Sequence, residues 1–196
     1  MSRNQIISTL KCWLLTAAAV LFTLGAVSIA RAGELAGVSF PDQATVGGKT
    51  VVLNGLGLRT ATMLKVKVYV MGLYVENRSS DPQAIIASGG NKRIAMHFVH
   101  DVAADKLRAG WTEGFEDNTD DVAGIKDEIA KFNASMRDVK EGDSIVLDFS
   151  GDKVDVLIND SKIDSIAGEA FQQAVLAIWL GLEPPNEGLK QGILGR

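Results

Sequence analysis

The hydrophobic pattern of this chain changes its period only a few times along the sequence. Residues 38–99 favour extended segments, whereas from Leu107 to Met136 apolar residues recur every three or four positions, as in amphipathic helices. Two more strand-like segments follow, and a final helix is predicted from Gly168 to Leu180. A parallel sheet needs a helix between successive strands, and that alternation is missing. The order therefore predicts an α+β fold, with an antiparallel sheet and helices on one side of it.

Turn and cap residues bound the predicted elements. We expect strands at residues 38–40, 43–46, 49–59, 64–75, 93–99, 144–149 and 153–158. Gly47-Gly48 tolerates the positive φ angles of a tight hairpin. One short helix is expected at Asp81–Ser88, with Asp81 as its cap and Pro82 as its first residue. The last helix carries apolar residues on all sides, which predicts that it is buried.

The N-terminus has the pattern of a secretory leader. Arg3 and Lys11 precede an apolar run that ends at Ile29, and Ala30-Arg31-Ala32 then places small residues at alternate positions. We expect a signal peptide at residues 1–32, cleaved at its end, and a periplasmic mature protein without a stable membrane anchor. An uncleaved anchor is the alternative, because the run approaches the roughly 20 residues that span a bilayer. Polar residues within the run weaken that alternative.

Loss of residues 1–32 changes the charge and the thiol content. Three cations and no acid are removed, so the formal charge falls from −4 to −7, and Cys12, the single cysteine, is removed as well. The mature chain then has no cysteine nucleophile, thiolate ligand or disulfide. Its acidity argues against a nucleic-acid partner. Its length suffices for one unaided core, and we expect a single domain at residues 37–195.

Motifs for nucleotide or metal chemistry are missing or incomplete. Gly55-Leu56-Gly57 lacks the third glycine and the following helix of a dinucleotide site, and a bulge or hairpin glycine explains it better. His97 and His100 would point to opposite faces of a strand. The acidic stretch from Glu113 to Asp121 has calcium-loop spacing, but Val122 stands where that loop needs glycine. We expect a solvated connection between helices there, and no metal or cofactor.

One segment combines a cation with a phenol. If the strand around Tyr69 alternates strictly, this residue shares a face with Met71, Leu73 and Val75. Arg59 ends the preceding strand and can reach the same space. A guanidinium and a phenol at one end of an apolar cavity suit an amphiphile with an anionic head. The alternative, which the residues alone favour, is a surface arginine and a core tyrosine bonded to a backbone carbonyl.

Several stretches together carry a family resemblance. They are Gly55–Arg59, Lys67–Val75, Ile166–Phe171 and Ala177–Gly181, followed by Pro184 and Leu189-Lys190. In this order and spacing they resemble the bacterial exported branch of the chalcone isomerase-like family, over residues 37–195. The resemblance implies an open-faced β-sandwich, a large antiparallel sheet with a layer of α-helices and a ligand cleft between them. It also implies two kinds of function, since the family holds ring-closing plant isomerases and non-catalytic fatty-acid binders.

The residues at individual positions favour the fatty-acid binders of the family over its isomerases. The resemblance assigns the family's anion-binding arginine to Arg59, and it places Tyr69 where fatty-acid binders have tyrosine and plant isomerases have threonine. The tyrosine and asparagine that hold the flavonoid in the plant enzymes fall on Ala103 and Gly110. Their helix-opening serine or threonine falls on Gly168. Three polar contacts of the enzymes are therefore absent.

Three functions remain at this point. The leading hypothesis is an exported, non-catalytic binding protein for a fatty acid or similar anionic amphiphile, with Arg59 and Tyr69 as its ligand-binding residues. The alternative is an isomerase for a flavonoid-like enone, in which Arg59 stabilises an oxyanion and Tyr69 or a water transfers protons. The third is a structural protein of the cell envelope whose cleft is filled by its own side chains.

Overall fold

The computed structural model describes residues 33–61 and 64–196, so the predicted leader lies outside it. The strands are β1 Gly33–Leu35, β2 Val38–Phe40, β3 Gln43–Val46, β4 Lys49–Ala61, β5 Val66–Val75, β6 Lys92–Phe98, β7 Ser144–Ser150, β8 Lys153–Ile158 and β9 Ser161–Ala167. The helices are α2 Pro82–Ala87, α3 Ala104–Asn118, the 3-10 turn η1 Ala123–Ile125, α4 Lys126–Ala134, α5 Glu169–Leu180 and α6 Glu187–Ile193. In these ranges no helix is both long enough and apolar enough to cross a membrane.

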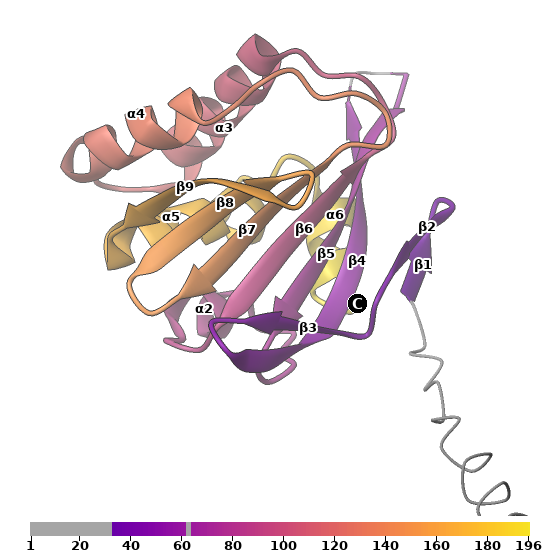
Figure 1. The fold of residues 1–196 in the computed structure, drawn as a ribbon, viewed down its shortest axis with the longest axis horizontal. Coiled ribbons are helices and arrows are strands. Elements are labelled where there is room, and N and C mark those ends of the chain that lie inside the picture. The colour runs from indigo at the N-terminus through magenta and orange to yellow at the C-terminus, as the bar shows by residue number, and fades with distance from the viewer. Residues whose placement is uncertain (1–32, 62–63) are drawn as a thin grey trace, which may run out of the picture. The chain divides into compact units, whose positions relative to one another are not determined.

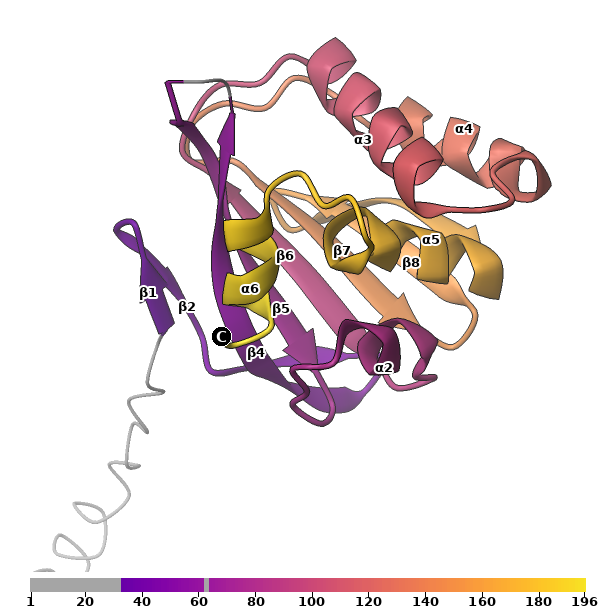
Figure 2. The same cartoon turned by 180° about the vertical axis from the view of Figure 1, so that it is seen from behind.

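The sheet is an antiparallel meander. Strands β3 to β9 pair in sequence order, while β1 and β2 form a separate two-stranded ribbon (Figure 1). The connection from β5 to β6 contains α2, and that from β6 to β7 contains α3, η1 and α4. Figure 2 shows α2, α5 and α6 across one face of the sheet, with α3 and α4 beside α5. The predicted α+β class is confirmed.

Strand β5 is buried on both of its faces. Its alternation places Tyr69, Met71 and Leu73 in the main core beneath the helices, as the sequence predicts. Val70 and Tyr74 point the other way and pack in a second, smaller cluster that includes residues of the β1–β2 ribbon. Because both sides are covered, the strand reads in the sequence as an almost continuous apolar run.

An aromatic cluster joins the helices to one another. Phe132 of α4 lies 4.8 Å from Trp111 and 6.0 Å from Phe115, both on α3, and 5.8 Å from Phe171 on α5, measured between ring centroids. Aromatic pairs at such distances add to the free energy of burial. Helix α5, predicted from the sequence at Gly168 to Leu180, is buried along most of its length, as expected, because it packs against α3, α2, α6 and β8.

Glycines allow α6 to pack directly on β4. A Cβ atom on Gly57 would collide with the carbonyl oxygen of Leu189, and one on Gly55 would collide with that of Gly192. The ladder between β4 and β5 also shifts its register between Leu53 and Gly55. The irregularity therefore falls at Asn54, just before Gly55-Leu56-Gly57, whose residues pair regularly with β5. The two glycines allow close backbone approach, which is the other role of a strand glycine, and not the binding of a nucleotide.

Three elements were not predicted. Strand β1 begins at Gly33, four residues before the predicted start of the domain at Gly37. Strand β9 is the polar edge of the sheet, and α6 contains Gly188 and Gly192, which are poor helix formers. All three depend on tertiary contacts rather than on a local pattern.

Candidate ligand cleft

Arg59 and Tyr69 are direct partners in the ladder between β4 and β5. Side chains of opposed residues in an antiparallel pair point to the same face of the sheet. Both side chains line one cleft on the helix-bearing side. Tyr69 is only 5% exposed, whereas Arg59 is part-buried. The structure therefore brings together the two residues that the sequence singled out, although ligand binding by them stays a prediction.

The cleft, here called the Arg59 cleft, lies between the sheet, α3 and the segment that follows α5. Its volume is about 620 Å³, within the range of small-molecule sites. Its apolar lining comprises Ala61, Val66, Val68, Val102, Ala103, Leu107, Trp111, Trp179, Pro184 and Pro185. Lining residues recur along one face of α3 from Ala103 to Asp117, which at 1.5 Å per residue is a length of roughly 21 Å. The lining is mainly apolar, and the charged side chains on it are those of Arg59, Asp101, Lys106, Glu113, Asp117 and Glu183.

Tyr69 is held by a hydrogen bond from Trp179. The indole Nε1–H donates to the Tyr69 hydroxyl oxygen at 2.9 Å, and both side chains are buried. The Tyr69 ring also packs edge-on against Phe98, with 5.4 Å between centroids. Since the hydroxyl oxygen accepts, its own proton is free to donate, and the part of the chain described here offers it no acceptor. Tyr74 is the tyrosine that bonds a backbone carbonyl, that of Pro41 at 2.9 Å.

The phenol of Tyr69 is a neutral donor. Burial raises its pKa above the ordinary value, an effect that the Trp179 hydrogen bond and the Arg59 charge only partly oppose. At physiological pH the group therefore keeps its proton and can donate it to an anion or a carbonyl in the cleft.

The guanidinium of Arg59 is largely uncommitted. Its Nη1 donates to the neighbouring Thr60 carbonyl, and no carboxylate outside residues 1–32 lies within ion-pair distance of it. At the rim, Asp101 is paired with Lys140 at 3.0 Å. A part-buried guanidinium without an ion-pair partner can donate hydrogen bonds to a carboxylate or similar anion.

The positions assigned to the plant enzymes' polar residues divide into two groups. Ala103 and Gly110 both line the Arg59 cleft, and a Cβ on Gly110 would meet no atom within 4 Å. Gly168 precedes α5 at a φ of 131° and is not part of the cleft lining. At the two cleft positions that the resemblance assigns to the enzymes' tyrosine and asparagine, this chain has a methyl group and open space.

The histidines do not meet at a metal site. His100 lies at the mouth of the Arg59 cleft, whereas His97 on β6 is not among the residues lining it. Among residues 33–61 and 64–196 there is no group of three or more His, Cys, Asp or Glu arranged to hold a metal ion.

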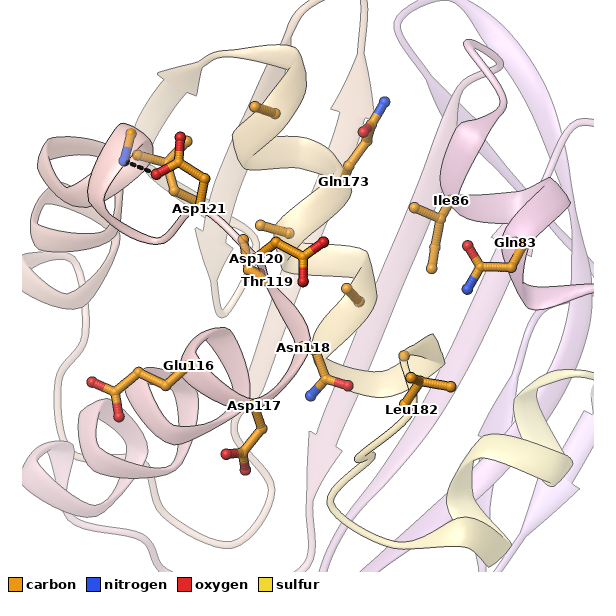
Figure 3. A pocket seen from close by; sticks show the side chains of 16 residues that line it. Gln83, Ile86, Glu116, Asp117, Asn118, Thr119, Asp120, Asp121, Gln173 and Leu182 are labelled. Carbon is orange, nitrogen blue, oxygen red and sulfur yellow. Dashed lines mark hydrogen bonds between the residues drawn. The ribbon is translucent and has the colours of Figure 1, made fainter.

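A second hollow, the acidic groove, lies between α2, α5 and the segment joining α3 to η1 (Figure 3). Its volume is about 600 Å³, and Glu116, Asp117, Asp120 and Asp121 form its rim. All four are exposed, as predicted, but only Asp120 and Asp121 lie in the connection between helices, because Glu116 and Asp117 belong to the last turn of α3. Asp121 accepts a hydrogen bond from the Gly124 N–H in η1 at 2.9 Å, which is a structural role.

An antiparallel sheet covered by helices, with a cleft at the layer interface that Arg59 and Tyr69 line, defines an open-faced β-sandwich. The sequence matches the family described as chalcone isomerase-like over residues 32–195, and the chain belongs to that family. Among solved structures it is similar to a fatty-acid binding protein of Arabidopsis thaliana, with a TM-score of 0.70 and 16% identity, covering 84% of this chain and 96% of that one. This likeness confirms the predicted fold. A search of curated proteins gives no significant match.

Sequence reasoning missed the role of Trp179. A tryptophan in a helix that is apolar on all sides indicates packing, and nothing local reveals a partner for its N–H. Only the assembled fold brings α5 to β5 and joins two residues that are 110 positions apart.

Proposed function

We propose that this chain is an exported, non-catalytic binding protein for a fatty acid or a similar anionic amphiphile. The observation that carries the proposal is the pair of donors that line the Arg59 cleft. There, a guanidinium without an ion-pair partner and a neutral phenol that is free to donate face a mainly apolar lining. The guanidinium and the phenol bind the head, and the apolar walls bind the tail.

Tail burial supplies most of the gross affinity. Each buried methylene contributes about 0.8 kcal/mol, so a tail of about a dozen carbons outweighs the head contacts before association costs are subtracted. Arg59 fixes the orientation and selects an anion, because a carboxylate in the planar grip of a guanidinium makes two parallel hydrogen bonds. Tyr69 adds a third donor.

Two further observations support binding over catalysis. The similar Arabidopsis structure is described as a fatty-acid binding protein. In addition, Ala103 and Gly110 bring no polar group to the cleft, so an enone would meet few preorganised contacts.

Solvent extraction of the purified protein, followed by mass spectrometry, tests the proposal. We expect a fatty acid to co-purify in an amount comparable with that of the protein. If no amphiphile is extracted and the emptied protein also fails to bind added fatty acid, the proposal is wrong.

We also propose that the mature protein is periplasmic and begins at Gly33. The support is the charged start, the apolar run and the Ala30-Arg31-Ala32 ending. Intact-mass measurement on protein from the soluble periplasmic fraction should give the mass of residues 33–196. Recovery of the full-length mass from the membrane fraction would contradict export with cleavage.

A further inference from the structure

Asn118, the last residue of α3, fastens the segment that follows α5. Its Nδ2 donates to the Glu183 carbonyl oxygen at 3.0 Å, and its Oδ1 accepts from the Glu183 N–H at 2.9 Å. The side-chain amide thus pairs with one residue's backbone as a neighbouring strand would. Nδ2 also donates to the Gly114 carbonyl at 3.0 Å, which fixes the rotamer. A Cβ on Gly181 would collide with the Asn118 side chain, so this close fit needs a glycine.

The Asn118–Glu183 pair stands between two hollows. Glu183 lines the Arg59 cleft, Asn118 lines the acidic groove, and Asp117 lines both. Figure 3 shows the Asn118 side chain between the end of α3 and Leu182. The two hollows are therefore neighbours, separated at this point by an amide and a short length of backbone.

The acidic groove has an apolar floor beyond this boundary. Ala174 and Ala177 of α5 and Ile86 of α2 line it, and Leu182 is 86% exposed. These apolar side chains lie in the hollow next to the Arg59 cleft, together with the polar side chains of Gln83 and Gln173. The carboxylates on the rim repel an anionic head, so this space accepts the tail of an anionic amphiphile and not its head.

We propose that the Asn118–Glu183 pair is the wall that ends the tail side of the Arg59 cleft, and that it sets the longest chain the protein accommodates. This proposal rests on the proposed function, because it assumes that the head lies at Arg59. Where the wall is removed, the floor of the acidic groove becomes the second part of the tail site.

The test is a chain-length series. Saturated fatty acids of about 10 to 20 carbons are titrated into wild type, Asn118→Ala and Asn133→Ala. Each added methylene that becomes buried should tighten binding by up to about fourfold. For wild type, affinity should rise with length and then stop rising. For Asn118→Ala, the rise should continue to longer chains. Asn133 donates to Thr112 and lines neither hollow, so its variant should keep the wild-type limit.

A second variant makes a smaller change at the same position, so that the test does not depend on whether Asn118→Ala folds. Asn118→Ser keeps a hydroxyl that can bond the Gly114 carbonyl but is too short to reach Glu183, and it should also move the limit to longer chains. If folded Asn118 variants show the same limit as wild type, the wall proposal is overturned. If wild type itself binds no fatty acid of any length, the proposed function is overturned instead.

Discussion

The indole N–H of Trp179 donates to the hydroxyl oxygen of Tyr69 at 2.9 Å, deep in the interface between α5 and β5. Trp179 has no exposed surface, so this bond forms out of contact with water. Because the indole can only donate, the Tyr69 oxygen must accept, and the phenolic proton is left to point elsewhere. The bond thereby turns a core tyrosine into an oriented donor beside Arg59.

This coupling predicts non-additive losses of stability. Tyr69→Phe leaves the buried indole N–H without an acceptor, at a cost of about 1–3 kcal/mol in the free energy of unfolding. Trp179→Phe should cost a similar amount, because it removes the donor and leaves a void. The double variant should cost less than the two single losses together, by about 0.5–3 kcal/mol. Urea denaturation of the four proteins measures this, and strict additivity would show that the bond does not couple the residues.

Stability should fall at alkaline pH. Burial raises the pKa of Tyr74 to about 12, and it raises the pKa of Tyr69 as well. In the unfolded chain tyrosines lose their protons near pH 10. Above that pH the unfolded state binds fewer protons than the folded state, so the free energy of unfolding decreases.

The Tyr74 contribution is complete below about pH 10 and is lost as the pH rises to about 12. Denaturant titrations at a series of pH values should therefore give a shallower decline for Tyr74→Phe than for wild type. Equal slopes for the two proteins would contradict the raised pKa.

Two glycine substitutions should change the free energy of unfolding in opposite directions. Gly57→Ala drives a methyl group into the Leu189 carbonyl, which should destabilise the fold by about 1–3 kcal/mol and loosen α6. Gly110→Ala lies in helix α3 with open space at the Cβ position, so it should stabilise by up to about 1 kcal/mol. Urea denaturation compares them. Wild-type stability in Gly57→Ala would mean that α6 is not pressed against β4.

Chalcone cyclisation should be negligible. Ala103 and Gly110 present no polar side chain to a bound enone, and missing preorganised contacts of this kind cost orders of magnitude in rate. The loss of chalcone absorbance follows the reaction directly. A turnover on the order of 1 per second or faster would make the protein an enzyme.

Much of the fold could be predicted because its signals are local. The hairpin at Gly47-Gly48 has both residues at positive φ. Asp81 caps α2 by accepting from the N–H groups of Gln83 and Ala84. Each of these choices depends on a few neighbouring residues, which the sequence displays directly.

The unpredicted elements are stabilised from a distance. Strand β9 contributes only Ile166 to the core. It is held to α4 by the Lys131–Asp164 ion pair at 3.2 Å and by the Lys131 bond to the Ser165 carbonyl. Helix α6 has weak intrinsic propensity and forms where glycines let it approach β4. Neither the bonds that hold β9 nor the close approach of α6 to β4 can be recognised in a window of neighbouring residues.

Part of the candidate site could be predicted because it depends on the local alternation of a strand. Strand alternation placed Tyr69 on the core face, and its pairing with Arg59 follows once β4 and β5 are adjacent. The contributions of Trp179 and of the Asn118–Glu183 pair depend on how α3 and α5 pack. That packing is a property of the whole core and cannot be inferred from either helix alone.

The most direct test of the account is the titration of a fluorescent fatty acid into wild type and three arginine variants. Arg59→Ala should weaken binding by about 2–5 kcal/mol, because it leaves a desolvated carboxylate without its partner. Arg59→Lys should recover part of this loss, since an ammonium cannot form the two-pronged grip. Arg137→Ala, at an exposed position outside the cleft lining, should bind like wild type. If Arg59→Ala binds as tightly as wild type, the anionic head does not lie at Arg59 and the central claim is wrong.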